Sequence, residues 1–134
     1  MQVTLLTSRF TRYWLPVGVY CIAIFIQSAF PTSRHLPQWP YLDKCLHVAG
    51  YALLGFLFFR ARITAQPTPN RNTTLILTIL FVALYGLSDE IHQSFVPGRS
   101  AEAADALADL VGGALGAGVA WRWFKRIDKP AGLL

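Results

Sequence analysis

The sequence has few charged residues for its length. Charged side chains make up 14% of the 134 residues, whereas 54% of the residues are hydrophobic. So little charge cannot cover the surface of a water-soluble domain of this size, which excludes a soluble enzyme and a soluble binding domain. A net charge of +5 does not indicate a nucleic-acid binder, because the basic residues stand between apolar runs and do not form one basic face. The missing polar surface predicts contact with lipid.

The sequence also lacks internal repeats, low-complexity segments and a cysteine framework. Without repeats or a linker, we expect a single transmembrane domain over residues 1–134. Cys21 and Cys45 are the only cysteines. They fall at different depths of two predicted membrane helices, so we expect free thiols and no disulfide.

Four apolar runs predict an all-α membrane protein. The predicted spans cover about residues 13–30, 41–59, 72–92 and 104–123, and prolines, Arg or Lys mark their ends. An α-helix needs about 20 residues to cross about 30 Å of hydrocarbon. The segment from Pro31 to Tyr41 is rich in proline and aromatic residues, which predicts a short connection at the membrane surface. We therefore expect an integral membrane bundle of four transmembrane helices.

The basic residues are distributed unequally between the two ends of these spans. Most of them fall on one side, and these are Arg9, Arg12, Arg60, Arg62, Arg71, Arg122, Lys125, Arg126 and Lys129. Arg34, Lys44 and Arg99 fall on the other side. The positive-inside rule therefore predicts that both termini and the loop of residues 60–71 are cytoplasmic.

The acidic residues gather at the opposite ends of the helices. They are Asp43, Asp89, Glu90, Glu102, Asp105 and Asp109, which leaves Asp128 alone on the basic side. The uninterrupted apolar stretches are shorter than a full crossing, so these side chains must enter the outer part of the bilayer. Charged groups at that depth are costly unless they are paired or hydrated.

Helical spacing places these polar residues on shared faces. The groups that share a face are Asp43 with His47, Asp89 with His92 and Gln93, and Asp105 with Asp109. The face of the fourth span continues through Gly112, Gly116 and Ala120, a spacing of small residues that lets membrane helices approach closely. Because lipid contact would be costly, we expect the three polar faces to meet in a pocket that opens outward.

Two purely structural interpretations of these residues stay open. Asp43 could act as an N-cap of the second helix. Asp89 and Glu90 oppose the helix macrodipole at the end of the third helix, so they need another partner, and Lys44 and Arg99 are available. The whole cluster could then be an ion-pair network that fixes how the helices align. Such a network does not explain why two histidines stand beside the carboxylates.

Two motifs resemble the VanZ-like family of small membrane proteins. The first runs from Asp43 through Lys44 and Cys45 to His47 and is followed by Tyr51 and Gly55, and the second runs from Asp89 to Arg99 and leads to Asp105. The resemblance covers roughly the second to the fourth span and implies a four-helix membrane domain.

The resemblance also implies which residues matter. The motif positions are Asp43, Lys44, His47, Glu90, Gln93, Arg99 and Asp105. The sequence departs from the family pattern at Val48, where Phe is expected, and at Asp109, where Asn is common.

The family is named for a protein linked to teicoplanin resistance, so the resemblance implies the bacterial cell envelope and a multi-pass protein of the cytoplasmic (inner) membrane. Our leading hypothesis is a pocket that binds a membrane lipid or lipid-linked envelope molecule and contributes to glycopeptide resistance. Lys44 and Arg99 would contact anionic groups. The candidate ligand-binding residues are Asp43, Lys44, His47, Asp89, Glu90, His92, Gln93, Arg99, Asp105 and Asp109.

An intramembrane enzyme on the same class of substrate is the alternative. Glu90 or Asp89 would act as general acid or base with His47 or His92, although no residue stands out as a nucleophile. We expect no cofactor, and no metal, because the sequence has no H-E-x-x-H motif or cysteine pair, even though Asp, Glu and His at helical spacing could ligate a divalent ion. A transporter is disfavoured because four helices enclose little pathway without oligomerising. Assembly into a homo-oligomer stays open.

Overall fold

The computed structural model describes residues 2–31, 39 and 41–127, with side chains from residue 10 to residue 124 of those ranges. This part of the chain forms four α-helices and no strand: α1 is Gln2–Ser28, α2 is Leu42–Ala65, α3 is Arg71–Gln93 and α4 is Ala103–Ile127. The expected all-helical architecture is confirmed.

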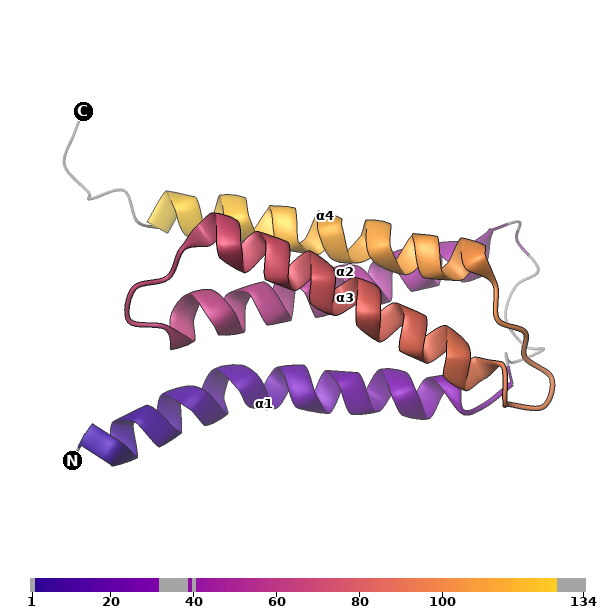
Figure 1. Cartoon of the computed structure of the whole chain (residues 1–134), viewed down its shortest axis with the longest axis horizontal. Coiled ribbons are helices and arrows are strands. Elements are labelled where there is room, and N and C mark those ends of the chain that lie inside the picture. Colours follow the sequence, from indigo (N-terminus) through magenta and orange to yellow (C-terminus); the bar gives the residue numbers. More distant parts are fainter. Residues whose placement is uncertain (1, 32–38, 40, 128–134) are drawn as a thin grey trace.

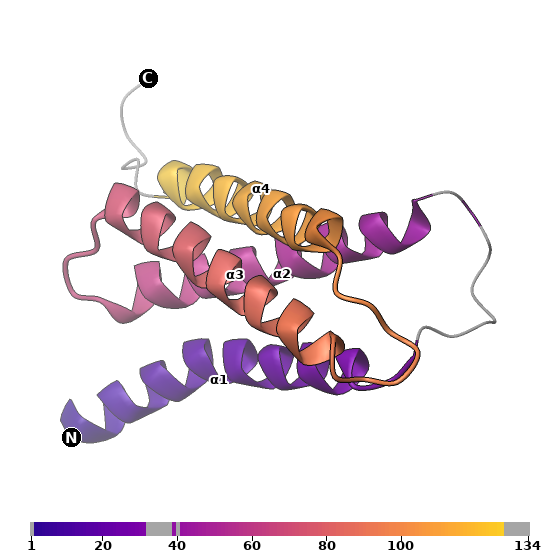
Figure 2. The same cartoon turned by 45° about the vertical axis from the view of Figure 1, so that its right-hand side comes forward.

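The four helices run alternately in opposite directions (Figure 1). The start of α1, the end of α2, the start of α3 and the end of α4 lie at one end of the bundle. The start of α2, the end of α3 and the start of α4 lie at the other end, which we call the polar end. Among the described residues, α1 packs against α2 and α3 and does not contact α4, and Figure 2 shows it set apart below the other helices.

Several helix ends differ from the sequence prediction. Helix α1 begins well before residue 13, and α2 continues past Arg60 and Arg62 to Ala65. A long arginine side chain can reach a polar environment while its backbone stays helical, so it does not end a helix. The Arg60 guanidinium lies over the Tyr13 ring, 5.3 Å from its centroid, which holds α2 against α1 at this end.

The N-cap role considered for Asp43 is wrong. Helix α2 begins at Leu42, so Tyr41 holds the cap position, with a left-handed backbone (φ 64°) and no side-chain cap. Asp43 lies in the first turn, where a negative charge still favours the positive end of the helix macrodipole. The predicted surface connection between Pro31 and Tyr41 lies largely outside the described residues.

Helices α2 and α4 make the closest contact in the bundle. A Cβ added at Gly112 would overlap the backbone of Val48, and one added at Gly116 would overlap the backbone of Ala52. Both glycines are buried, and Ala120 is fully buried on the same face of α4. The prediction that small residues turn this face into the bundle is confirmed, because only a helix surface without side chains lets two backbones come this close.

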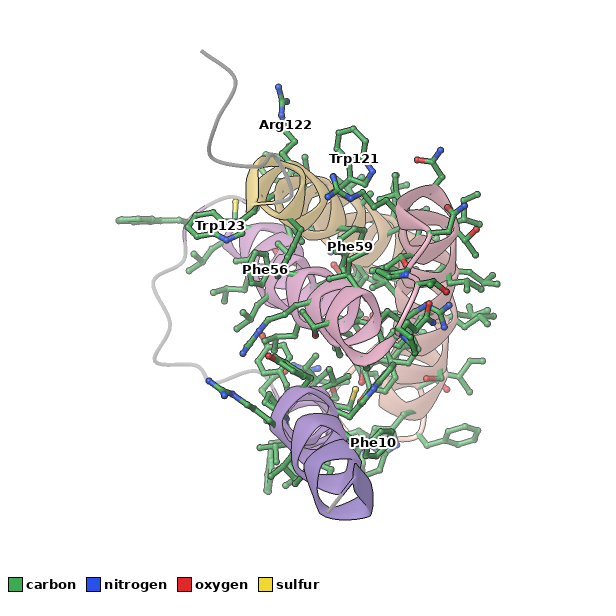
Figure 3. All side chains as sticks on the ribbon, turned by 90° about the vertical axis from the view of Figure 1, so that its left-hand side faces the viewer. Phe10, Phe56, Phe59, Trp121, Arg122 and Trp123 are labelled. Atoms are coloured by element: carbon green, nitrogen blue, oxygen red, sulfur yellow. The ribbon has the colours of Figure 1, made fainter. Side chains whose placement is uncertain are left out.

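The outer surface of the bundle is apolar. Helices α2, α3 and α4 are each long and apolar enough to cross a membrane, so the chain has the character of a multi-pass membrane protein. Figure 3 views the bundle from the end where α1 begins, and it shows Phe59 between α2 and α4. Trp123 and Arg122 point away from the bundle in the same view. Cys21 and Cys45 are free thiols, as expected.

The Gly116→Ala substitution should destabilise the bundle. Its Cβ would force α4 away from the backbone of Ala52, and overpacking of this kind costs about 1–3 kcal/mol. We expect a lower thermal unfolding midpoint, measured by tryptophan fluorescence of the purified protein in detergent. Gly118→Ala is the matched control, because a Cβ there meets nothing within 4 Å. Equal midpoints for the two variants would contradict the close α2–α4 contact.

Candidate functional site

Lys44 holds the beginning of α2 against the beginning of α4. Its ammonium group forms salt bridges with Glu102 (2.7 Å), Asp105 (2.6 Å) and its own neighbour Asp43 (3.0 Å). A lysine has three N–H donors, so the three carboxylates match its whole donor capacity. We call Asp43, Lys44, Glu102 and Asp105 the lysine cluster.

One helical turn deeper, His47 on α2 pairs with Asp109 on α4. The Nδ1 atom of His47 lies 2.8 Å from Oδ1 of Asp109, a hydrogen-bonding distance, whereas its Nε2 atom is 3.9 Å from Oδ2 of Asp105. Asp109 is fully buried. Room for its carboxylate comes from Gly86 on α3, where an added Cβ would lie 3.0 Å from Oδ2 of Asp109.

Glu90 approaches the same place from α3. Its Oε2 atom accepts a hydrogen bond from the backbone N–H of Glu102 at 2.8 Å. Its Oε1 atom, like Oδ2 of Asp109, is buried and has no hydrogen-bond partner among the described residues. One ligand atom each of His47, Glu90 and Asp109 lie within 4.8 Å of one another. We call these three residues the inner triad.

A second polar group joins α3 to α1. Asp89 accepts hydrogen bonds from the Ser28 hydroxyl (2.9 Å) and from the Gln93 side-chain amide (3.0 Å), and all three residues are buried. His92 stacks on the Phe25 ring of α1, with ring centroids 4.3 Å apart. The polar residues at the end of α3 therefore divide between two neighbours, because Glu90 faces α4 while Asp89 and His92 face α1.

The predicted site residues thus fall into two groups. The group formed by α2, α3 and α4 contains Asp43, Lys44, His47, Glu90, Asp105 and Asp109, and the group at α1 contains Asp89, His92 and Gln93. Arg99 lies in the turn between α3 and α4, partly buried. The chain turns at this position, since Gly98 has φ 84° and Arg99 N–H donates to the Val96 carbonyl. Within the described contacts, His47 and His92 do not share a carboxylate.

The candidate site residues did not include Glu102, which the structure places in the lysine cluster, nor Ser28 and Gly86. Ser28 is the α1 partner of Asp89, and its signal was a hydroxyl near the end of the apolar run of α1. Gly86 stands four residues before Glu90, on the same face of α3, and this spacing could have marked it as a neighbour of the site.

Exposure falls steadily from the surface to the inner triad. The side chains of Asp43 and Glu102 are 56% and 50% exposed, those of Lys44 and His47 are 23% and 18% exposed, and that of Asp109 is 0% exposed. A continuous row of polar groups therefore leads from the polar end of the bundle to a buried carboxylate. The lysine cluster is paired as a structural network would be, but the inner triad is not fully paired.

Comparison with protein families agrees with the motifs in the sequence. A family model described as VanZ/LLP1 matches residues 4–125. No curated protein gave a match. No solved structure gave a match either.

The Lys44→Met substitution should destabilise the protein. It removes the cation shared by three carboxylates, and the loss should be about 2 kcal/mol, less than the ~3–5 kcal/mol of a fully buried pair, because Lys44 is partly exposed. The thermal unfolding midpoint in detergent measures the effect. Asp43→Asn should shift the midpoint far less, because that carboxylate is the most exposed of the three. A Lys44→Met protein as stable as the wild type would show that the lysine cluster does not hold α2 to α4.

Proposed function

The chain belongs to the VanZ/LLP1 family, and we propose that it binds the polar headgroup of a membrane lipid or lipid-linked envelope molecule through the polar end of α2, α3 and α4. The whole chain would act as one transmembrane domain in the bacterial cytoplasmic (inner) membrane. By this binding it would contribute to envelope maintenance, and to glycopeptide resistance of the teicoplanin type.

One observation carries the proposal. Glu90 Oε1 and Asp109 Oδ2 are buried acceptors without a hydrogen-bond partner among the described residues. An unsatisfied buried polar group costs about 1–3 kcal/mol, and more when it is charged. Two such oxygens lie close together, at the buried end of a row of polar side chains. This arrangement suits a ligand that supplies the missing hydrogen-bond donors.

The arrangement of charges favours particular ligand chemistry. Lys44 is already paired with three carboxylates, so we assign it to holding the helices together. We propose that the guanidinium of Arg99, in the turn between α3 and α4, contacts an anionic group of the ligand, because its planar donors match phosphate or carboxylate oxygens. The acceptors of the inner triad would face the part of the headgroup that carries hydroxyl or amino donors, or a cation.

We propose four membrane crossings with both termini in the cytoplasm. Three helices meet the length and hydropathy expected of a span. Helix α1 is not one of these three, but it exposes a continuous apolar row suited to lipid, formed by Leu15, Val19, Ile22 and Ile26. The start of α1 and the end of α4 lie at the same end of the bundle, together with the basic loop between α2 and α3 (Figure 1). The positive-inside rule assigns that end to the cytoplasm.

Cysteine labelling tests this topology. In a chain with Cys21 and Cys45 replaced by alanine, Ser100→Cys should react with a membrane-impermeant maleimide in intact cells. Thr68→Cys should react only after the membrane is permeabilised, because residue 68 lies in the loop at the basic end. Both positions are exposed, so burial does not account for a difference. The reverse labelling pattern would overturn the proposed orientation.

Complementation tests the binding role. In a strain that lacks the gene, Glu90→Gln and Arg99→Ala should restore glycopeptide tolerance at least about tenfold less well than the wild type, which corresponds to about 1.4 kcal/mol of lost interaction. Membrane expression of every variant is matched by immunoblot. Asp128→Asn is the control, because it removes an acid that follows the last helix in the sequence. Full activity of both test variants would show that the polar end has only a structural role.

A second candidate function is an intramembrane enzyme. The pairing of His47 with the buried Asp109 beside Glu90 favours it, since a carboxylate that orients a histidine next to a second carboxylate is an arrangement used in acid–base catalysis. His92 would have no part in this chemistry, because its ring packs on Phe25. Turnover of a lipid-linked substrate by the purified protein, lost in His47→Gln, would favour the enzyme over the binding role.

A further inference from the structure

The inner triad places two buried carboxylates beside a single imidazole. The ammonium group of Lys44 is engaged by the carboxylates of the lysine cluster. Asp89, the residue before Glu90 on α3, accepts hydrogen bonds from the neutral side chains of Ser28 and Gln93. Among the printed contacts of the described residues, the imidazole of His47 is paired with Asp109. Neutral hydroxyl donors would satisfy the free oxygens, whereas a cation would also offset the negative charge of two ionised carboxylates.

We propose that His47, Glu90 and Asp109 bind a divalent transition-metal ion of the zinc or manganese type. The three residues offer one ring nitrogen and two carboxylate oxygens, all within 4.8 Å of one another. Imidazole with carboxylate is a donor set for such ions, whereas Mg²⁺ and Ca²⁺ prefer oxygen alone. Ligand atoms about 2.1 Å from a tetrahedral ion lie about 3.4 Å apart, so small side-chain rotations would close the triad on the ion.

Two free and buried oxygens point to this ligand independently of the clustering. Glu90 and Asp109 are 4% and 0% exposed, and each keeps one oxygen without a hydrogen-bond partner among the described residues. A metal ion would satisfy both oxygens at once and would place positive charge beside the two carboxylates. The carboxylates therefore have the free lone pairs that coordination needs.

The surrounding contacts orient each ligand. The backbone N–H of Glu102 holds Oε2 of Glu90 and leaves Oε1 as the free oxygen. The absent Cβ of Gly86 makes room for the carboxylate of Asp109. Binding of the ion through Nδ1 of His47 would replace the present 2.8 Å contact of that atom with Oδ1 of Asp109. Outer contacts such as the one from Glu102 fix the orientation of metal ligands and tune their affinity.

Three protein ligands would leave at least one coordination position open, as in catalytic zinc sites. Side-chain exposure falls from Asp43 and Glu102 inward, and we infer that an oxygen of the headgroup reaches that position from this end. This inference rests on the proposed function, because it names the group by which the polar end would hold a headgroup.

Metal content of the purified protein tests the proposal. The full chain in detergent is stripped with EDTA, incubated with Zn²⁺ or Mn²⁺ alone, desalted and assayed by elemental mass spectrometry. We expect about one ion per chain in the wild type, and at least about tenfold weaker binding in Glu90→Gln and Asp109→Asn. Asp128→Asn should bind like the wild type. A wild-type chain that retains neither ion would overturn the proposal.

A spectroscopic measurement covers the case in which a variant fails to fold. Co²⁺ added to the stripped wild-type protein should give visible absorption bands of a nitrogen and oxygen site, and Zn²⁺ should abolish them. Bands that persist unchanged in a folded His47→Gln protein would place the ion elsewhere and overturn the assignment of the triad.

The metal-binding test and the complementation test can fail independently of each other. A protein without bound metal whose Glu90→Gln variant still loses glycopeptide tolerance would reject the metal and keep the headgroup role, with organic donors filling the triad. A protein that binds one metal ion through the triad, but whose variants retain full tolerance, would keep the metal and reject the proposed function.

Discussion

The contact between the backbones of α2 and α4 is the constraint on which the polar end depends. Glycines at 112 and 116 bring α4 so close to Val48 and Ala52 that no side chain fits between them. This closeness sets the relative height of the two helices, and with it the partners of their polar side chains. Lys44 pairs with Asp105 and His47 with Asp109 where the close approach of α2 and α4 brings these positions together. The packing surface and the polar cluster are therefore two parts of one interface.

Much of this arrangement could be predicted from sequence. Apolar runs of membrane length gave four helices, and the repeat of small residues identified the inward face of α4. The same face carries Asp105 and Asp109, so their meeting with α2 followed from the cost of charge in lipid. The helix ends were less predictable, because an arginine such as Arg60 can lie over an aromatic ring and leave the helix unbroken.

The sequence could not predict that the polar residues of α3 contact two different neighbouring helices. Asp89 and Glu90 are adjacent, so helical geometry alone turns them about 100° apart, but it does not say which neighbour each one meets. Helix α1 has no acidic residue in its apolar run that would indicate a contact with polar residues of α3. A single serine such as Ser28 is a weak signal for such a contact. The inner triad was hidden for a related reason. Its members come from three helices, so no local spacing connects His47, Glu90 and Asp109 before the bundle is assembled.

The long separation of these partners along the chain bears on how the protein is made. His47 and Asp109 are 62 residues apart, so α2 leaves the ribosome well before α4 exists. Until α4 has been made, Lys44 and His47 lack the carboxylates of Asp105 and Asp109 that they pair with in the folded bundle. The apolar part of α2 is long enough to cross a membrane by itself, whereas its polar first turns find their α4 partners only once α4 has been made. Truncation before residue 105 would leave Lys44 without Asp105 and His47 without Asp109.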